Sequence, residues 1–92
     1  MTGRIESYLH SDMTTPNKGG AMVRVESDTD FGSRTDAFVA FARGVAKRAY
    51  AAQAGDWKDV VALFPEMETQ RLTLQTELRE KVTVSEITIL NV

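Results

Sequence analysis

The chain has 92 residues, a formal net charge of −2, 42% hydrophobic residues and 26% charged residues. This composition is ordinary for a folded globular protein, so it argues against a disordered chain, and the length allows one small domain. Basic residues are scattered along the sequence, which argues against a nucleic-acid-binding surface. Dimerisation is one way for so small a chain to enlarge its core.

The residue types that usually carry enzyme chemistry are scarce. The chain has no cysteine and one histidine, and it contains neither a glycine-rich phosphate loop nor a paired-histidine metal motif. We therefore expect a protein that is not an enzyme and that uses no cofactor or metal. No apolar run approaches the ~20 residues of a membrane span, and we expect no leader at the start of the chain. We expect a cytoplasmic protein that does not act on membranes.

Two alternating segments near the N-terminus predict an antiparallel β-hairpin. In residues 4–10 and in residues 21–27, successive side chains alternate between two faces, which is typical of a half-buried strand. The side chains on one side are Ile5, Ser7 and Leu9 in the first segment and Ala21, Val23 and Val25 in the second. The joining segment Ser11–Gly20 is rich in turn-forming residues, so it predicts a long polar loop, to which the sequence assigns no role.

A long amphipathic helix is predicted after the hairpin. Residues 28–32 are acidic and too few for an element of their own, so we expect them to form a connection. The apolar residues beyond them recur at helical spacing and predict a core-facing stripe. The stripe consists of Phe38, Phe41, Ala42, Val45, Ala46, Ala49 and Tyr50. Either Ser33 or Thr35 can supply the N-cap. Gly55 is a natural stop.

The remaining sequence predicts two more helices and a strand. Asp56 can cap a short helix over residues 57–63 that ends before Pro65. A third helix is predicted over residues 66–82, and the β-branched residues of 85–92 predict a strand. The order predicts an α+β fold: a small antiparallel sheet, made of the hairpin and the C-terminal strand, with two or three helices packed on one face.

Several segments resemble the elongation factor Ts family in order and spacing, except that the hairpin loop is longer here. Residues 3–10 read Gly-Arg-Ile-Glu-Ser-Tyr-Leu-His, where that family has a strand ending in Tyr-Ile-His. Residues 20–26 resemble its second strand, and Asp-Thr-Asp-Phe at residues 28–31 resembles its Glu-Thr-Asp-Phe-Val turn. Residues 34–38 resemble the opening of its next helix. A weaker similarity covers residues 78–92.

The resemblance implies a role in translation elongation and protein biosynthesis. It implies that residues 1–92 form a single domain similar to one half of the family's dimerisation core. The implied activity is guanine-nucleotide exchange: binding of the GTPase elongation factor Tu and promotion of GDP release. In the family, the Asp and Phe of the turn intrude beside the partner's magnesium and phosphate site, where the Phe acts as a wedge. The matching partner-binding residues here are Thr29, Asp30, Phe31, Gly32 and Arg34.

This sequence also departs from the family pattern. The family's N-terminal helical domain, second core half and coiled-coil arm are not visible in it. Position 32 is Gly where the family usually has Val or Ile, and Asp28 replaces the glutamate that precedes the Thr. Family members with a single core half act as dimers, so the resemblance implies a homodimer formed partly through the sheet.

Other interpretations of the same residues remain open. The protein could be an adaptor that docks on elongation factor Tu without exchange, such as a virus-encoded protein that tethers or sequesters it. Phe31 could instead pack beneath the start of the following helix, as a hydrophobic staple does. Asp30 could serve only to place negative charge near a helix N-terminus.

Overall fold

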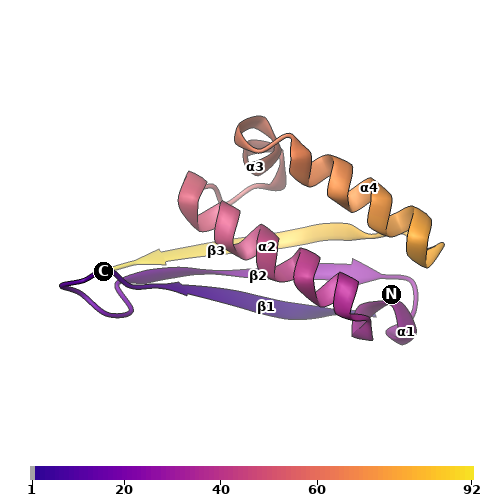
Figure 1. Ribbon diagram of the computed structural model, residues 1–92, viewed down its shortest axis with the longest axis horizontal. Helices are drawn as coiled ribbons and strands as arrows, with labels where there is room; N and C mark the ends of the chain where they lie inside the picture. The colour runs from indigo at the N-terminus through magenta and orange to yellow at the C-terminus, as the bar shows by residue number, and fades with distance from the viewer. Residues whose placement is uncertain (1) are drawn as a thin grey trace.

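The computed structural model describes residues 2–92, which form a three-stranded antiparallel sheet with helices on one face (Figure 1). The strands are β1 (Thr2–His10), β2 (Gly19–Ser27) and β3 (Thr83–Asn91), with β2 in the centre. The helices are α1 (Asp30–Arg34), α2 (Asp36–Ala52), α3 (Trp57–Leu63) and α4 (Glu66–Leu78). The predicted α+β architecture is confirmed, and the sheet has the predicted composition of a hairpin plus a C-terminal strand.

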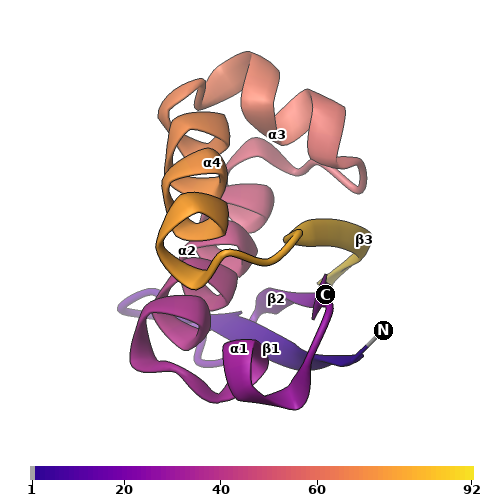
Figure 2. The same cartoon turned by 90° about the vertical axis from the view of Figure 1, so that its right-hand side faces the viewer.

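Helix α2 is the element that covers the sheet. It packs against all three strands, while α3 contacts β3 and α4 lies against α2 and α3. Viewed along the strands, α2, α3 and α4 lie on one side of the sheet and the other side is bare (Figure 2). The predicted stripe of α2 is buried as far as Ala49, and Tyr50 is half-buried. The stripe packs on Ala21, Val23 and Val25 of β2, each at most 3% exposed.

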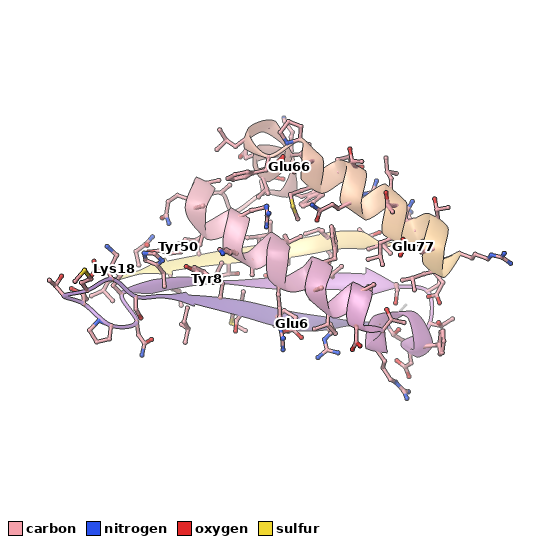
Figure 3. The ribbon with its side chains drawn as sticks, in the orientation of Figure 1. Glu6, Tyr8, Lys18, Tyr50, Glu66 and Glu77 are labelled. Carbon is pink, nitrogen blue, oxygen red and sulfur yellow. The ribbon has the colours of Figure 1, made fainter. Side chains whose placement is uncertain are left out.

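The faces of β1 are distributed less obviously. Glu6, Tyr8 and His10 are half-buried beneath α2, whereas the apolar Ile5 and Leu9 lie on the bare face. The rings of Tyr8 and Tyr50 lie beside one another, with centroids 5.8 Å apart (Figure 3). The His10 ring stacks on Tyr50 with centroids 5.0 Å apart. Aromatic stacking against α2 therefore selects the more polar side of this strand as the inner side.

The long hairpin loop is ordered around one carboxylate. Asp12 accepts backbone N–H bonds from Thr14 at 2.9 Å and Thr15 at 2.6 Å, and it forms an ion pair with Lys18 at 3.0 Å. The hydrogen bond from the Lys18 ammonium is the largest of the contacts that hold the pKa of Asp12 far below its ordinary value. The loop tip is consequently a defined turn, with Met13 fully exposed.

Three predicted boundaries were wrong, each because of local capping. Residues 28–32 are more than a connection, because α1 begins at Asp30. Helix α2 is capped by Thr35 and ends at Ala52 rather than near Gly55, since Gln53 adopts the left-handed conformation with φ 52°. Helix α4 stops at Leu78 instead of Val82, because Arg79 is left-handed with φ 57°.

The chain after α4 is then drawn back to the core. The side chain of Gln75 accepts the N–H of Val82 at 2.9 Å, and Arg71 donates to the carbonyl of Val82 at 2.8 Å. Val82 is thereby fully buried without being helical, and β3 starts at Thr83, two residues before the predicted position.

We predict that the two phenylalanines at the α1–α2 junction differ sharply in their contribution to stability. Phe38 is fully buried, so Phe38→Ala is expected to lower the free energy of unfolding by about 3–5 kcal/mol. Phe31 is 77% exposed, so Phe31→Ala is expected to change it by less than about 0.5 kcal/mol. Urea unfolding followed by circular dichroism measures both, and equal losses would contradict the burial described here.

Candidate partner-binding site

The five residues predicted to bind a partner lie together in and beside the short helix α1. This helix joins β2 to α2 at the end of the sheet opposite the hairpin loop (Figure 1). Thr29 is its N-cap, and the Thr29 hydroxyl accepts the N–H of Gly32 at 3.4 Å. Thr35 closes the other end by donating its hydroxyl to the Gly32 carbonyl at 2.9 Å. Thr35 also caps α2, so the helices meet at a fixed corner.

Helix α1 has an inner side and an outer side. Gly32 and Ser33 are buried, whereas Asp30, Phe31 and Arg34 are exposed. The ring of Phe31 projects away from the core, so the interpretation of Phe31 as a staple under α2 was wrong. Asp30 occupies the first turn of α1, where the helix dipole favours a negative charge. This stabilising role is compatible with contact to a partner, because the carboxylate is also exposed.

The exposed charges of α1 restrain one another weakly. Arg34 lies 3.7 Å from the Asp30 carboxylate, and both side chains are largely exposed. Such a surface pair contributes between zero and about 1 kcal/mol. Both side chains can therefore reorient towards a partner at little cost.

The backbone of α1 is held from beneath by polar side chains of the sheet. The Ser27 hydroxyl donates to the Thr29 carbonyl at 2.9 Å, and Arg4 donates to the Ser33 carbonyl at 3.3 Å. Arg4 is itself oriented by Glu6 of the same strand at 2.7 Å. Sequence reasoning missed Arg4 and Glu6 as supports, because nothing local to β1 shows that it passes under α1.

Glu6 accepts a second hydrogen bond, from Arg43 of α2 at 3.0 Å. Burial raises the pKa of Glu6, but the hydrogen bonds from Arg43 and Arg4 outweigh burial and hold this pKa below its ordinary value. The ionised carboxylate therefore ties β1 to α2 and fixes the arginine that supports α1.

A second support comes from the corner between α4 and β3. Both oxygens of Glu80 contact Thr29: one accepts its N–H at 2.8 Å and the other its hydroxyl at 2.7 Å. In the opposite direction, the carboxylate of Asp28 accepts the N–H of Lys81 at 3.0 Å. Sequence reasoning noted the similarity over residues 78–82 but could not pair this segment with Thr29, about fifty residues earlier.

The surroundings of α1 are open and polar. An open hollow of about 610 Å³ beside the turn is lined by Asp28 and by side chains of α4 and the following corner, including Arg79 and Lys81. Among residues 2–92, no group of three or more His, Cys, Asp or Glu residues is placed to hold a metal ion. None of the helices in that range is long and apolar enough to cross a membrane. The described residues thus present an exposed aromatic ring beside charged groups.

No protein-family model matches the sequence. Over 73 residues, which are 79% of the chain, the sequence is 37% identical to elongation factor Ts of Cellvibrio japonicus (strain Ueda107). The chain is similar to part of elongation factor Ts. The matched segment is 24% of that protein, so the chain spans about a quarter of the length of the curated relative it matches.

This match supports a weak relationship to elongation factor Ts, as the motifs of the sequence predict. It covers most of this chain but a minor part of the relative. The roles of Thr29, Asp30, Phe31, Gly32 and Arg34, and the correspondence with one half of a core domain, stay predictions.

We predict that the ionisation of Glu6 makes the free energy of unfolding depend on pH in the acidic range. Because the folded pKa of Glu6 lies below its unfolded value, its contribution is fully present above the unfolded pKa of about 4.3 and disappears as the pH falls through the folded pKa. Glu6→Gln is expected to cost about 1 kcal/mol at neutral pH. The difference from wild type should shrink below about pH 4.

Urea unfolding at a series of pH values measures this difference. The control is Glu77→Gln on α4, where the carboxylate is exposed. A difference between wild type and Glu6→Gln that stays constant with pH would show that the contribution of Glu6 does not depend on ionisation.

Proposed function

We propose that this protein binds elongation factor Tu and promotes the release of GDP from it. The observation that carries the proposal is the ring of Phe31, which is 77% exposed on a turn braced from two sides. The identity with part of elongation factor Ts supports the choice of partner. The turn carries the Thr-Asp-Phe sequence that resembles the turn of that family.

The mechanism is displacement by an inserted side chain. A GTPase holds its nucleotide largely through magnesium and phosphate contacts. Phe31 enters an apolar pocket beside those contacts and shifts the residues that line it, while Asp30 adds a negative charge near the metal and phosphates. If a protein binds the nucleotide-free GTPase more tightly than the GDP-bound form by a given factor, it must weaken the binding of GDP by that same factor. No covalent bond is made or broken in this process.

The energetics suit a single aromatic anchor. Burying a phenylalanine side chain is worth about 1.5–3 kcal/mol, and aromatic residues often dominate interfaces. The turn that carries Phe31 is already closed by Thr29 and Thr35 in the free protein. Less conformational entropy is then lost on binding, which favours affinity.

We predict that Phe31→Ala removes most of the exchange activity. With elongation factor Tu loaded with fluorescent GDP, wild type should accelerate release in excess unlabelled GDP. Phe31→Ala should need about 30-fold more protein for the same rate, because the anchor is lost. Asp30→Asn should show a smaller loss. Since Phe31 and Asp30 are exposed, both variants are expected to fold normally.

Two other results would change the conclusion. Equal rates for wild type and Phe31→Ala would remove the role given to the ring. Tight binding of elongation factor Tu without faster GDP release would favour the adaptor, which docks on the GTPase without exchange. A binding measurement in parallel with the release assay separates these results.

We also propose that two copies associate through the bare face of the sheet. The exposed apolar side chains on this face come from all three strands: Ile5 and Leu9 from β1, Met22 from β2 and Leu90 from β3. They are 50–70% exposed, and a hollow of about 530 Å³ lies between Leu9, Met22 and Leu90. A second copy would cover this face and give the sheet a second apolar layer.

We predict that charge on the bare face breaks the dimer. Leu9→Asp and Leu90→Asp each place a carboxylate in the expected interface, so the dissociation constant should rise at least about tenfold. Leu72→Asp on α4, where the leucine is 48% exposed, is the matched control. Sedimentation equilibrium measures the association, and a wild-type mass of 10.2 kDa at all concentrations would rule the dimer out.

A further inference from the structure

Two segments that are distant in sequence clasp one another at the candidate site. The turn between β2 and α1 contributes Asp28 and Thr29, and the corner between α4 and β3 contributes Glu80 and Lys81. Each segment offers a carboxylate to a backbone N–H of the other: Glu80 to Thr29 at 2.8 Å and Asp28 to Lys81 at 3.0 Å. We call this pair of contacts, together with the bond from the Thr29 hydroxyl to Glu80, the clasp.

The position of Glu80 depends on the absence of a side chain at position 32. A Cβ atom on Gly32 would lie 2.8 Å from one carboxylate oxygen of Glu80 and 2.9 Å from the other. Contacts this short do not occur, so any residue larger than glycine would force the carboxylate to move. Gly32 does not have a positive φ. Its small size, rather than its backbone conformation, leaves room for the carboxylate of Glu80.

The clasp holds the N-terminus of α1, immediately before the residues that project outward. Thr29 is the N-cap, and Asp30 and Phe31 are the next two residues. A five-residue helix is too short to be stable by itself. Hydrogen bonds to an ionised acceptor are stronger than neutral ones, so Glu80 is well suited to stabilise the cap.

We propose that Glu80 is a positioning residue, which holds Thr29 and thereby fixes the direction in which Asp30 and Phe31 project. The expected effect of Glu80 on partner binding rests on the proposed function, because Glu80 holds the turn that is proposed to bind elongation factor Tu. Glu80 is not expected to contact the partner through its carboxylate, since both oxygens are occupied by Thr29. If the turn is formed for only a fraction of the time, the observed affinity falls by that fraction.

The experiment compares four forms of the full chain with wild type: Glu80→Ala, Glu80→Gln, Gly32→Ala and the double variant Gly32→Ala with Glu80→Ala. Two quantities are measured for each form. Amide hydrogen exchange of Thr29 in the free protein reports the clasp without any partner. The dissociation constant for nucleotide-free elongation factor Tu reports the positioning of Phe31.

Glu80→Ala removes both acceptors, so Thr29 exchange should be about tenfold faster and the partner should bind about tenfold more weakly. Glu80→Gln keeps a carbonyl for the N–H of Thr29 and offers an N–H to its hydroxyl, so it should restore most of both quantities. Gly32→Ala should resemble Glu80→Ala by displacing the carboxylate. In the double variant Gly32→Ala should add little, because the clash is gone.

Distinct results would overturn distinct parts. Unchanged Thr29 exchange in Glu80→Ala would refute the clasp, and additive effects in the double variant would refute the link between Gly32 and Glu80. Faster amide hydrogen exchange of Thr29 in Glu80→Ala, with unchanged affinity for elongation factor Tu, would refute the positioning role. If wild type itself fails to bind elongation factor Tu, the proposed function and the positioning role are both wrong. Faster amide hydrogen exchange of Thr29 in Glu80→Ala would still support the clasp in that case. Glu77→Ala, an exposed residue on α4, controls for general loosening of that helix.

Discussion

The packing of α2 across the sheet is the constraint on which the rest of the molecule depends. The small and branched side chains of α2, such as Ala42, Val45 and Ala46, are completely buried against the inner face of the strands. Alanines allow a close approach of helix and sheet, so the distance between the end of β2 and the start of α2 is set by core packing. The residues between these two points must cover that distance with a particular shape.

Helix α1 covers this distance, and its composition follows from its buried inner side and its exposed outer side. Gly32 and Ser33 are small because they face the sheet and the α4–β3 corner, where little space remains. Phe31 has no place on that side and is exposed, as is the preceding residue Asp30. The exposure of a large aromatic ring is therefore a consequence of the tight inner packing.

The sequence predicted those features that depend on local periodicity. The stripe of α2 and the inner face of β2 follow from repeating apolar positions, and helix α3 follows from the cap at Asp56 and the stop at Pro65. The structure agrees with all three. Alternation in β1 revealed two faces but could not say which one α2 would cover, because that choice depends on Tyr50, forty residues later. Helix α1 was not predicted, since five residues containing a glycine carry no periodic signal.

The residues that support the candidate site could not be predicted from the sequence either, because local patterns carry no signal for contacts between distant segments. Thr29, Asp30 and Phe31 are adjacent and were recognised through a motif. Glu80 and Arg4 reach the turn only because the tertiary fold brings their segments together. The supports of the site are therefore long-range contacts of single side chains, which local patterns do not encode.

The elongated shape of the molecule separates its two projecting ends. The principal extents are 43 × 24 × 19 Å, with α1 at one end of the sheet and the ordered hairpin loop at the other (Figure 1). Nine-residue strands lie between them, a span of roughly 30 Å. A dye or surface linker attached in place of the exposed Met13 would therefore sit far from Phe31, on a turn closed by hydrogen bonds to Asp12.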